Sequence, residues 1–254
     1  YVVLGGYVLR AYDGRGVRAL GGFAVLWGLG NGIFNATDLY LHVSLGITTQ
    51  QQYATAGFSQ TFELFLAVET VLSVLLTTVA PFVWVAFVLN YTTQLQPKHR
   101  RGYTGIVVLV TGLVLLLTGP SVLNTLGLNV EVANAFLFLT GLVVIGSQIG
   151  VAGAGVAQMY KTSQQYQQLS TTEALAVATP LLVLFNNAAN NLGVYNRFVS
   201  IYSVYFLLHL VGLVGLTAAT ERYNLLGQLP VANTIARDTA IDTVDVGIVV
   251  LDAE

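Results

Sequence analysis

The stretch SIYSVYFLLHLVGLVGLTAA (Ser200–Ala219) decides the fold class, because it is about twenty residues long, largely apolar, and free of Asp, Glu, Lys and Arg. A helix of about twenty such residues crosses the hydrocarbon core of a bilayer. The polar segment TERYNLLGQLPVANTIARDTAIDTVD (Thr220–Asp245) follows it directly, and then comes the β-branched run VGIVVLD (Val246–Asp252). This order predicts a membrane helix, a cytoplasmic signalling helix over residues 221–245 and a strand.

The composition also indicates an integral membrane protein. Of the 254 residues, 55% are hydrophobic and only 9% are charged, with a mean hydropathy of +0.71. A soluble domain would carry about a quarter charged residues. Because cysteine is absent, disulfides, thiolate metal sites and a cysteine nucleophile are excluded. The net charge of −2 gives no indication of a nucleic-acid partner.

Six further apolar segments precede the last one, so we expect an all-α, seven-transmembrane helix bundle over residues 1–220. The first segment resembles the end of a helix whose upstream part is missing. The third is expected to bend or break at Pro81, and the sixth to kink at Pro180. The predicted segments are residues 1–9, 19–41, 61–91, 104–118, 130–160 and 171–192.

Lysine and arginine predict the orientation, because cytoplasmic loops are enriched in both. The connections on one side of the predicted bundle hold nine of these residues, and the connections on the other side hold only Arg197. We therefore expect a multi-pass protein of the cell membrane, with its N-terminus outside and its C-terminus in the cytoplasm. The nine residues are Arg10, Arg15, Arg18, Lys98, Arg100, Arg101, Lys161, Arg222 and Arg237.

Small residues at a spacing of four predict close helix contacts in lipid. One such row lies in the second segment and another in the fifth. We expect both to serve packing within the chain rather than contact between chains. The rows are Gly28, Gly32 and Ala36, and Gly146, Gly150 and Ala154.

Polar side chains inside membrane segments are costly and often mark a site. The second segment places four of them along one helix face, and the third adds Glu69, Ser73 and Thr77 at the same spacing, with Glu63 nearer the outer end. Together they predict an outward-facing cavity that binds a small ligand, an ion or protons. The candidate ligand-binding residues are Trp27, Asn31, Asn35, Asp38, Glu63, Glu69, Asn187, Asn190, Asn191, Arg197 and His209.

An alternative interpretation is a hydrogen-bonded lattice between helices that binds nothing. The lattice is preferred for the asparagine cluster alone, whereas a functional role is preferred for Asp38 and Glu69. Arg197 is a candidate partner for Asp38 or Glu63. A lone intramembrane histidine such as His209 is more often structural, although it has the chemistry to titrate beside Glu69.

Several established kinds of site are not indicated. The last segment has no lysine for retinal, and a second intramembrane histidine for a bis-histidine haem is lacking. The motifs HExxH and GxSxG and a glycine-rich phosphate loop do not occur. We therefore expect no catalytic residues, no metal and no cofactor in this segment.

Two stretches resemble the seven-transmembrane N-terminal sensor region of archaeal and bacterial sensor histidine kinases. PFVWVAFVLNYT (Pro81–Thr92) is similar to a helix end of that family, with Phe87 and Tyr91 in matching places. LPVANTIARDTAIDTVDVGIVVLDAE (Leu229–Glu254) is similar to its exit helix, followed at residues 246–254 by the first strand of a truncated PAS-like domain. The resemblance implies kinase activity only for a longer parent chain, and another output domain is equally allowed.

The expected function is therefore that of a membrane signal receptor in a two-component system. Its partners would be the bilayer, an unknown small ligand, a downstream cytoplasmic PAS or kinase domain, and a second copy of the chain. A linker helix that packs on its own PAS-like domain is an equal alternative to the homodimer. A transporter or channel subunit, or a structural membrane subunit, is the competing class. The acidic tail is typical of a halophilic archaeal source.

Overall fold

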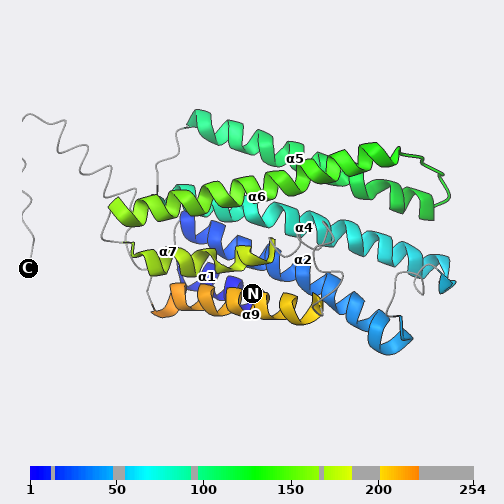
Figure 1. The fold of residues 1–254 in the computed structure, drawn as a ribbon, viewed down its shortest axis with the longest axis horizontal. Coiled ribbons are helices and arrows are strands. Elements are labelled where there is room, and N and C mark those ends of the chain that lie inside the picture. The colour runs from blue at the N-terminus through cyan, green and yellow to red at the C-terminus, as the bar shows by residue number, and fades with distance from the viewer. Residues whose placement is uncertain (13–14, 48–54, 93–96, 166–168, 185–200, 223–254) are drawn as a thin grey trace, which may run out of the picture.

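The computed structural model describes residues 1–12, 15–47, 55–92, 97–165, 169–184 and 201–222, and nearly all of these are helical (Figure 1). No strand occurs within these ranges. The predicted signalling helix and PAS-like strand lie almost wholly outside them. The helices are α1 (Val2–Ala11), α2 (Arg15–Leu45), α4 (Gln60–Thr92), α5 (Pro97–Thr125), α6 (Asn134–Gln165), α7 (Thr171–Ala178) and α9 (Ile201–Thr217).

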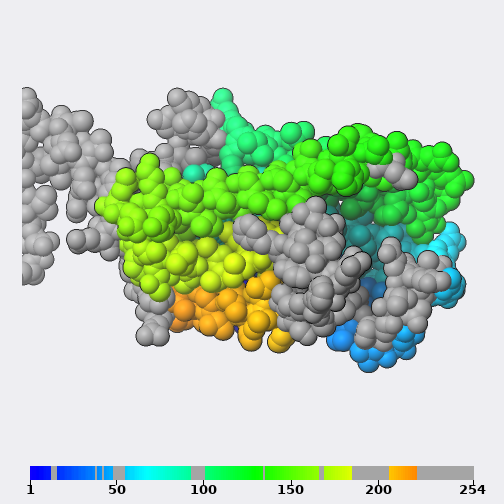
Figure 2. Space-filling model, viewed as in Figure 1, coloured from blue at the N-terminus to red at the C-terminus, as the bar shows by residue number. Residues whose placement is uncertain are grey.

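The helices form an elongated bundle in which α2 and α4 lie side by side at the centre (Figure 1). Helices α5 and α6 pack against α4, and α1 packs against α2. Helix α9 packs against α7 and against the 3₁₀ turn η1 (Thr179–Leu181) that follows α7. In the space-filling view α6, α7 and α9 make up much of one face of the molecule (Figure 2).

Four of the helices are long and apolar enough to cross a membrane. By helix length and composition, this confirms the prediction of a membrane protein. These stretches are Gly16–Leu45, Gln60–Thr92, Arg101–Thr125 and Ala135–Gln165. The apolar stretches Val2–Ala11, Thr171–Leu184 and Phe206–Glu221 are shorter within the described residues. Seven crossings therefore remain a prediction.

The outer faces of α5 and α6 are apolar and exposed. Val108 is 66% exposed on α5, and Phe138 is 66% exposed on α6. Gly146 and Gly150 are also exposed on α6, since a Cβ at either would meet no atom of the described residues within 4 Å. The prediction that this row packs a helix was therefore wrong for the described helices, because the row faces away from them.

The tightly packed core lies toward the end of the bundle at which α4 ends. Trp84, Phe87 and Val88 of α4 are fully buried there, together with Phe23 of α2 and Met159 of α6. Lipid tails are as apolar as these side chains, so close packing rather than the hydrophobic effect stabilises such contacts in a membrane. This core closes one half of the bundle with large side chains.

The motif at the end of α4 belongs to the same core. Phe87 and Tyr91 are buried, and their ring centroids lie 5.6 Å apart. Thr92 is buried too and donates its hydroxyl proton to the carbonyl of Val88, 2.8 Å away. In the structure these residues therefore pack the end of the helix.

Glycine permits α1 and α2 to approach closely. A Cβ at Gly5 would lie 2.7 Å from the Gly21 carbonyl oxygen, and a Cβ at Gly28 would lie 2.7 Å from Cβ of Tyr1. Such distances are too short for any larger residue. Gly28 thus serves close packing as predicted, whereas no atom of the described residues lies within 4 Å of a Cβ at Gly32.

The two membrane prolines have different effects. Helix α4 continues without interruption through Pro81, so it does not break there, and a bend at Pro81 stays a prediction. Pro81 is buried within the bundle, where neighbouring helices can support the backbone. At Pro180 the helix does change, because α7 gives way to the 3₁₀ turn η1. Pro180 has no N–H for the carbonyl of Ala176, and the hydroxyl of Thr179 donates to that oxygen instead at 2.7 Å.

The tryptophan Trp84 ties α4 to the irregular end of α7. Its indole Nε1 donates to the carbonyl oxygen of Val177 at 3.0 Å, and both residues are fully buried. Helix α6 covers the same ring, because Gly155 leaves no room for a side chain against it. The kinked segment is therefore fixed to the centre of the bundle by a specific hydrogen bond.

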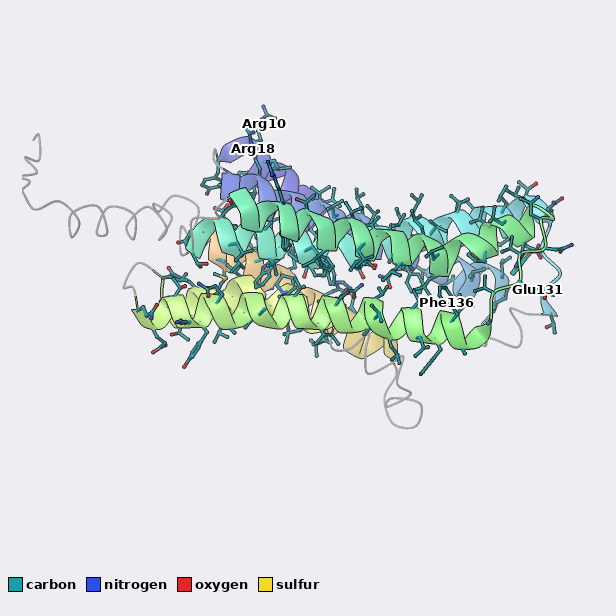
Figure 3. All side chains as sticks on the ribbon, turned by 90° about the horizontal axis from the view of Figure 1, so that it is seen from above. Arg10, Arg18, Glu131 and Phe136 are labelled. Carbon is teal, nitrogen blue, oxygen red and sulfur yellow. The ribbon has the colours of Figure 1, made fainter. Side chains whose placement is uncertain are left out.

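Charged residues are divided between the two ends of the bundle (Figure 3). Arg10 and Arg18 lie at one end and Glu131 lies at the other. Helix α6 ends at the same end of the bundle, on the side away from the arginines, and exposed Lys161 lies in its last turns. The topology and the orientation in a membrane remain predictions.

Replacing Trp84 by Phe should lower the stability of the bundle more than replacing Trp27 by Phe. Both changes replace an indole by a smaller phenyl ring, so they remove the same side-chain volume. Only the change at Trp84 also removes a hydrogen bond to a described partner, and this loss costs about 1–2 kcal/mol when the acceptor stays buried. Reversible unfolding of the purified chain in mixed micelles measures the difference. Equal losses for the two variants would contradict the anchoring role of Trp84.

Candidate functional site

The close contact between α2 and α4 brings the predicted polar faces of these helices together. Ser73 of α4 donates its hydroxyl proton to the carbonyl oxygen of Gly30 in α2, at 2.8 Å. A Cβ at Gly30 would lie 2.8 Å from Cγ2 of Thr77 and 2.9 Å from Cβ of Leu76. The glycine therefore lets the two backbones meet, and the serine bridges them.

Glu69 lies on this same side of α4, one helical turn before Ser73. Its exposed fraction is 6%, and that of Ser73 is 4%. Residues four apart share a helix face, so the carboxyl group faces the α2 side of the bundle. Glu69 is thus a buried acid within the bundle, while its predicted role in ligand binding stays a prediction.

The asparagines of α2 use their amides to bond their own helix. Asn31 Nδ2 donates to the carbonyl oxygen of Trp27 at 2.8 Å, and Asn35 Nδ2 donates to that of Asn31 at 2.6 Å. Asn31 is buried and Asn35 is half-buried. These bonds hold both amides along one face of the helix.

His209 of α9 meets the other end of this row. Its ring centroid lies 6.2 Å from that of Trp27 and 6.0 Å from that of Tyr1. The Tyr1 hydroxyl donates to the carbonyl oxygen of His209 at 3.0 Å. Three segments that are far apart in the sequence, the start of the chain, α2 and α9, thus converge on one aromatic contact.

Trp27 contributes a buried polar group to this contact. The residue is 0% exposed, and its Nε1 has no hydrogen-bond partner within the part of the chain that the structure describes. A buried N–H without a partner costs about 1–3 kcal/mol, so the position favours an acceptor atom. We call Trp27, Asn31, Glu69, Ser73 and His209 the polar cluster.

The structure leaves the other predicted site residues outside this cluster or undescribed. Glu63 is exposed in the first turn of α4, so it does not share the burial of Glu69. Asp38 belongs to α2, but its side chain is outside the description. The remaining four lie outside the described residues, which leaves the predicted Arg197 pairings untested; they are Asn187, Asn190, Asn191 and Arg197.

Tyr1 and Gly30 were missed from the sequence as members of this region. A terminal tyrosine carries no pattern that points to a partner on α9, and Gly30 lies outside the Gly28–Gly32 spacing. Within the described residues, no group of three or more His, Asp or Glu side chains forms a possible metal site.

Comparison of the chain with protein-family models, curated proteins and solved structures finds no match. The resemblance to sensor histidine kinases therefore stays a prediction that depends on two short motifs. The chemistry of the site is inferred from its own geometry.

Replacing Gly30 by Ala should destabilise the bundle by about 1–3 kcal/mol, because the added Cβ overlaps α4, including the backbone nitrogen of Thr77 at 3.0 Å. Gly32→Ala on the same helix is the control. Its Cβ meets no atom of the described residues within 4 Å, so the higher helix propensity of alanine should keep stability equal or raise it by roughly 0.5–1 kcal/mol. Unfolding midpoints in mixed micelles compare the two, and a Gly30→Ala variant as stable as Gly32→Ala would refute the close contact.

Proposed function

We propose that the chain is the sensor region of a membrane signal receptor, in which a small ligand, ion or proton acts at the polar cluster and α9 carries the response to the cytoplasm. The observation that supports this most is that α9 contacts two different parts of the bundle. It contacts the polar cluster through His209 and, one turn later, the kinked end of α7 through Gly212 and Gly215.

The contact between α9 and the kink is close enough to couple the two. A Cβ at Gly212 would lie 2.8 Å from Cα of Pro180, and a Cβ at Gly215 would lie 2.9 Å from Cβ of Thr179. The Thr179 hydroxyl also lies 3.4 Å from the Gly212 carbonyl oxygen. Because packed helices shift between discrete arrangements, a displacement of α9 at His209 would change the fit at Pro180.

The end of α9 differs from the rest of the helix. A wider, π-helical turn covers Ala218–Arg222, and Thr220 donates its hydroxyl proton to the carbonyl of Leu216 at 3.1 Å. Such turns are rare and occur frequently at functional sites. We propose that the signal leaves the bundle here, enters a signalling helix over residues 221–245, and reaches a PAS-like domain that begins at residues 246–254.

The finer parts of the proposal rest on the sequence. They are the seven crossings with the N-terminus outside, the homodimer, and a histidine-kinase output in a two-component system. The filled core around Trp84 and Phe87 supports a receptor over a transporter or channel, because a through-route would have to pass between these buried rings. Flux assays on vesicles containing the chain separate these classes.

His209→Ala should change the position of the end of α9 relative to α6. The change removes the ring that contacts Trp27 and Tyr1, so α9 loses its link to the polar cluster. Spin labels at Thr217→Cys and Lys161→Cys, both exposed in a chain with no native cysteine, measure the distance by pulsed electron resonance in nanodiscs. We expect a shift of about 1–2 Å or a second population.

Phe206→Ala is the matched control for this measurement. Phe206 lies on the same helix and is 71% exposed, so its loss should leave the distance distribution unchanged. If His209→Ala gives the same distribution as Phe206→Ala and the unsubstituted chain, then α9 does not respond to the cluster and the proposed coupling is wrong.

A further inference from the structure

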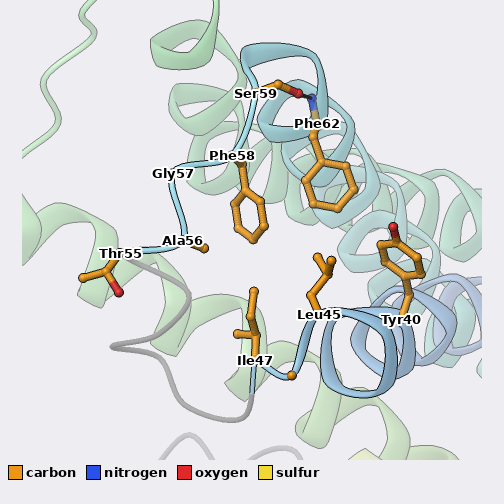
Figure 4. A pocket seen from close by; sticks show the side chains of 10 residues that line it. Tyr40, Leu45, Ile47, Thr55, Ala56, Gly57, Phe58, Ser59 and Phe62 are labelled. Carbon is orange, nitrogen blue, oxygen red and sulfur yellow. Dashed lines mark hydrogen bonds between the residues drawn. The ribbon is translucent and has the colours of Figure 1, made fainter.

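A hollow lies away from the polar cluster, where α2 ends and α4 begins (Figure 4). It is an open pocket of about 700 Å³, and none of the polar-cluster residues lines it. Binding pockets for small organic molecules typically have volumes of about 300–1,000 Å³. The larger side chains that line it, together with one threonine, are Tyr40, Leu45, Ile47, Thr55, Phe58 and Phe62.

Specific backbone turns form the walls of this pocket. Gly46 and Gly57 have φ values of 65° and 59°, in the left-handed region that glycine adopts without strain. The N–H of Ile47 bonds the Leu41 carbonyl at 3.1 Å after α2, and Ser59 accepts the N–H of Phe62 on its carbonyl at 2.9 Å as α4 begins. Both walls are thus set by local hydrogen bonds, which favours a preformed pocket.

Aromatic rings dominate the pocket. The Phe58 and Phe62 centroids lie 5.0 Å apart at 58°, and those of Tyr40 and Phe62 lie 6.2 Å apart at 59°. Figure 4 shows Phe62 above the same hollow as Leu45. Phe62 is half-buried, whereas Phe65, one turn along α4, is 55% exposed. Phe62 therefore faces the pocket rather than the surroundings.

The charge around the pocket selects the class of ligand. Glu63 follows Phe62 directly and is exposed. The described connections at this end of the bundle, residues 46–47, 55–59 and 126–133, contain Glu131 and no Lys, Arg or His. An anion would find no positive side chain in these connections, while a cation is attracted both by the carboxylates and by the negative faces of the rings.

We propose that this pocket binds an apolar organic cation, of the quaternary ammonium or phosphonium class with aromatic or short aliphatic substituents. Leu45 and Ile47 contact the apolar groups, and the rings of Phe58 and Phe62 attract the charge. The hydroxyl of Tyr40 offers a hydrogen bond to a polar substituent. Binding here does not depend on the receptor proposal, because it requires no signalling output.

Tetraphenylphosphonium and tetraphenylborate test the proposal, since they share size and shape and differ in the sign of the charge. Equilibrium dialysis uses nanodiscs with the chain and, as a blank, empty nanodiscs. We expect saturable binding of the phosphonium at about one per chain above the blank and none of the borate. Phe62→Ala should weaken binding roughly fivefold or more, while Phe138→Ala, an exposed aromatic of α6, should leave it unchanged.

Glu63→Gln keeps the test decisive if Phe62→Ala does not fold. The residue is exposed, so the fold should be retained, and phosphonium binding should weaken about threefold through loss of the nearby charge. Three results would each overturn the proposal. The first is phosphonium uptake equal to that of the blank, and the second is equal saturable binding of the borate. The third is phosphonium binding that is unchanged both in Glu63→Gln and in a folded Phe62→Ala.

Discussion

The contact between α2 and α4 at Gly30 and Ser73 is the constraint on which the bundle depends. Inside a bilayer, polar groups must find partners within the protein, because lipid offers none. The missing side chain of Gly30 brings the two backbones together, and the Ser73 hydroxyl uses that proximity to bond the Gly30 carbonyl at 2.8 Å. The burial of Glu69 one turn away follows from the same approach, since the two helices cover each other along this row. The packing of α2 against α4 and the burial of polar side chains beside it thus depend on this one close crossing.

The kink at Pro180 illustrates how the rest of the bundle accommodates an irregular backbone. Proline leaves the Ala176 carbonyl without its usual N–H, and the hydroxyl of Thr179 compensates. The next carbonyl, that of Val177, accepts the indole N–H of Trp84. Gly215 lets α9 lie directly on this segment, where any larger residue would collide with Thr179. An element that would be costly in lipid is therefore held from three sides, by its own side chain, by α4 and by α9.

The sequence predicts the parts of this structure that depend on local pattern. The apolar runs place every described helix within a few residues of its observed core, and the four-residue spacing of Trp27, Asn31 and Asn35 correctly predicts a shared helix face. Several observed helices are longer than predicted. Helix α5 extends from Pro97 to Thr125, because apolar character marks the membrane part and not the helical turns beyond it. Tertiary contact decides the remainder. Neither the continuity of α4 through Pro81 nor the exposure of Gly146 can be read from spacing alone, since both depend on which neighbours surround the helix. The pocket residues Phe58 and Phe62 were not predicted for the same reason, because the pocket depends on how the end of α2 lies against the start of α4.

The polar cluster and the aromatic pocket occupy different depths of one helix pair, and the Gly30 contact explains why both exist. Asn31 and Tyr40 are nine residues apart on α2, which corresponds to roughly 13 Å along a helix. At Gly30 the backbones are too close to enclose anything larger than a polar atom. Figure 1 shows α2 turning away from α4 toward its end, where the larger side chains Leu45 and Phe62 line a hollow between the separating helices. A pair of helices joined closely at one point and separated at another has room for an organic molecule only at the separated end. The buried crossing is thus suited to small polar species, and the open end to ligands with apolar bulk.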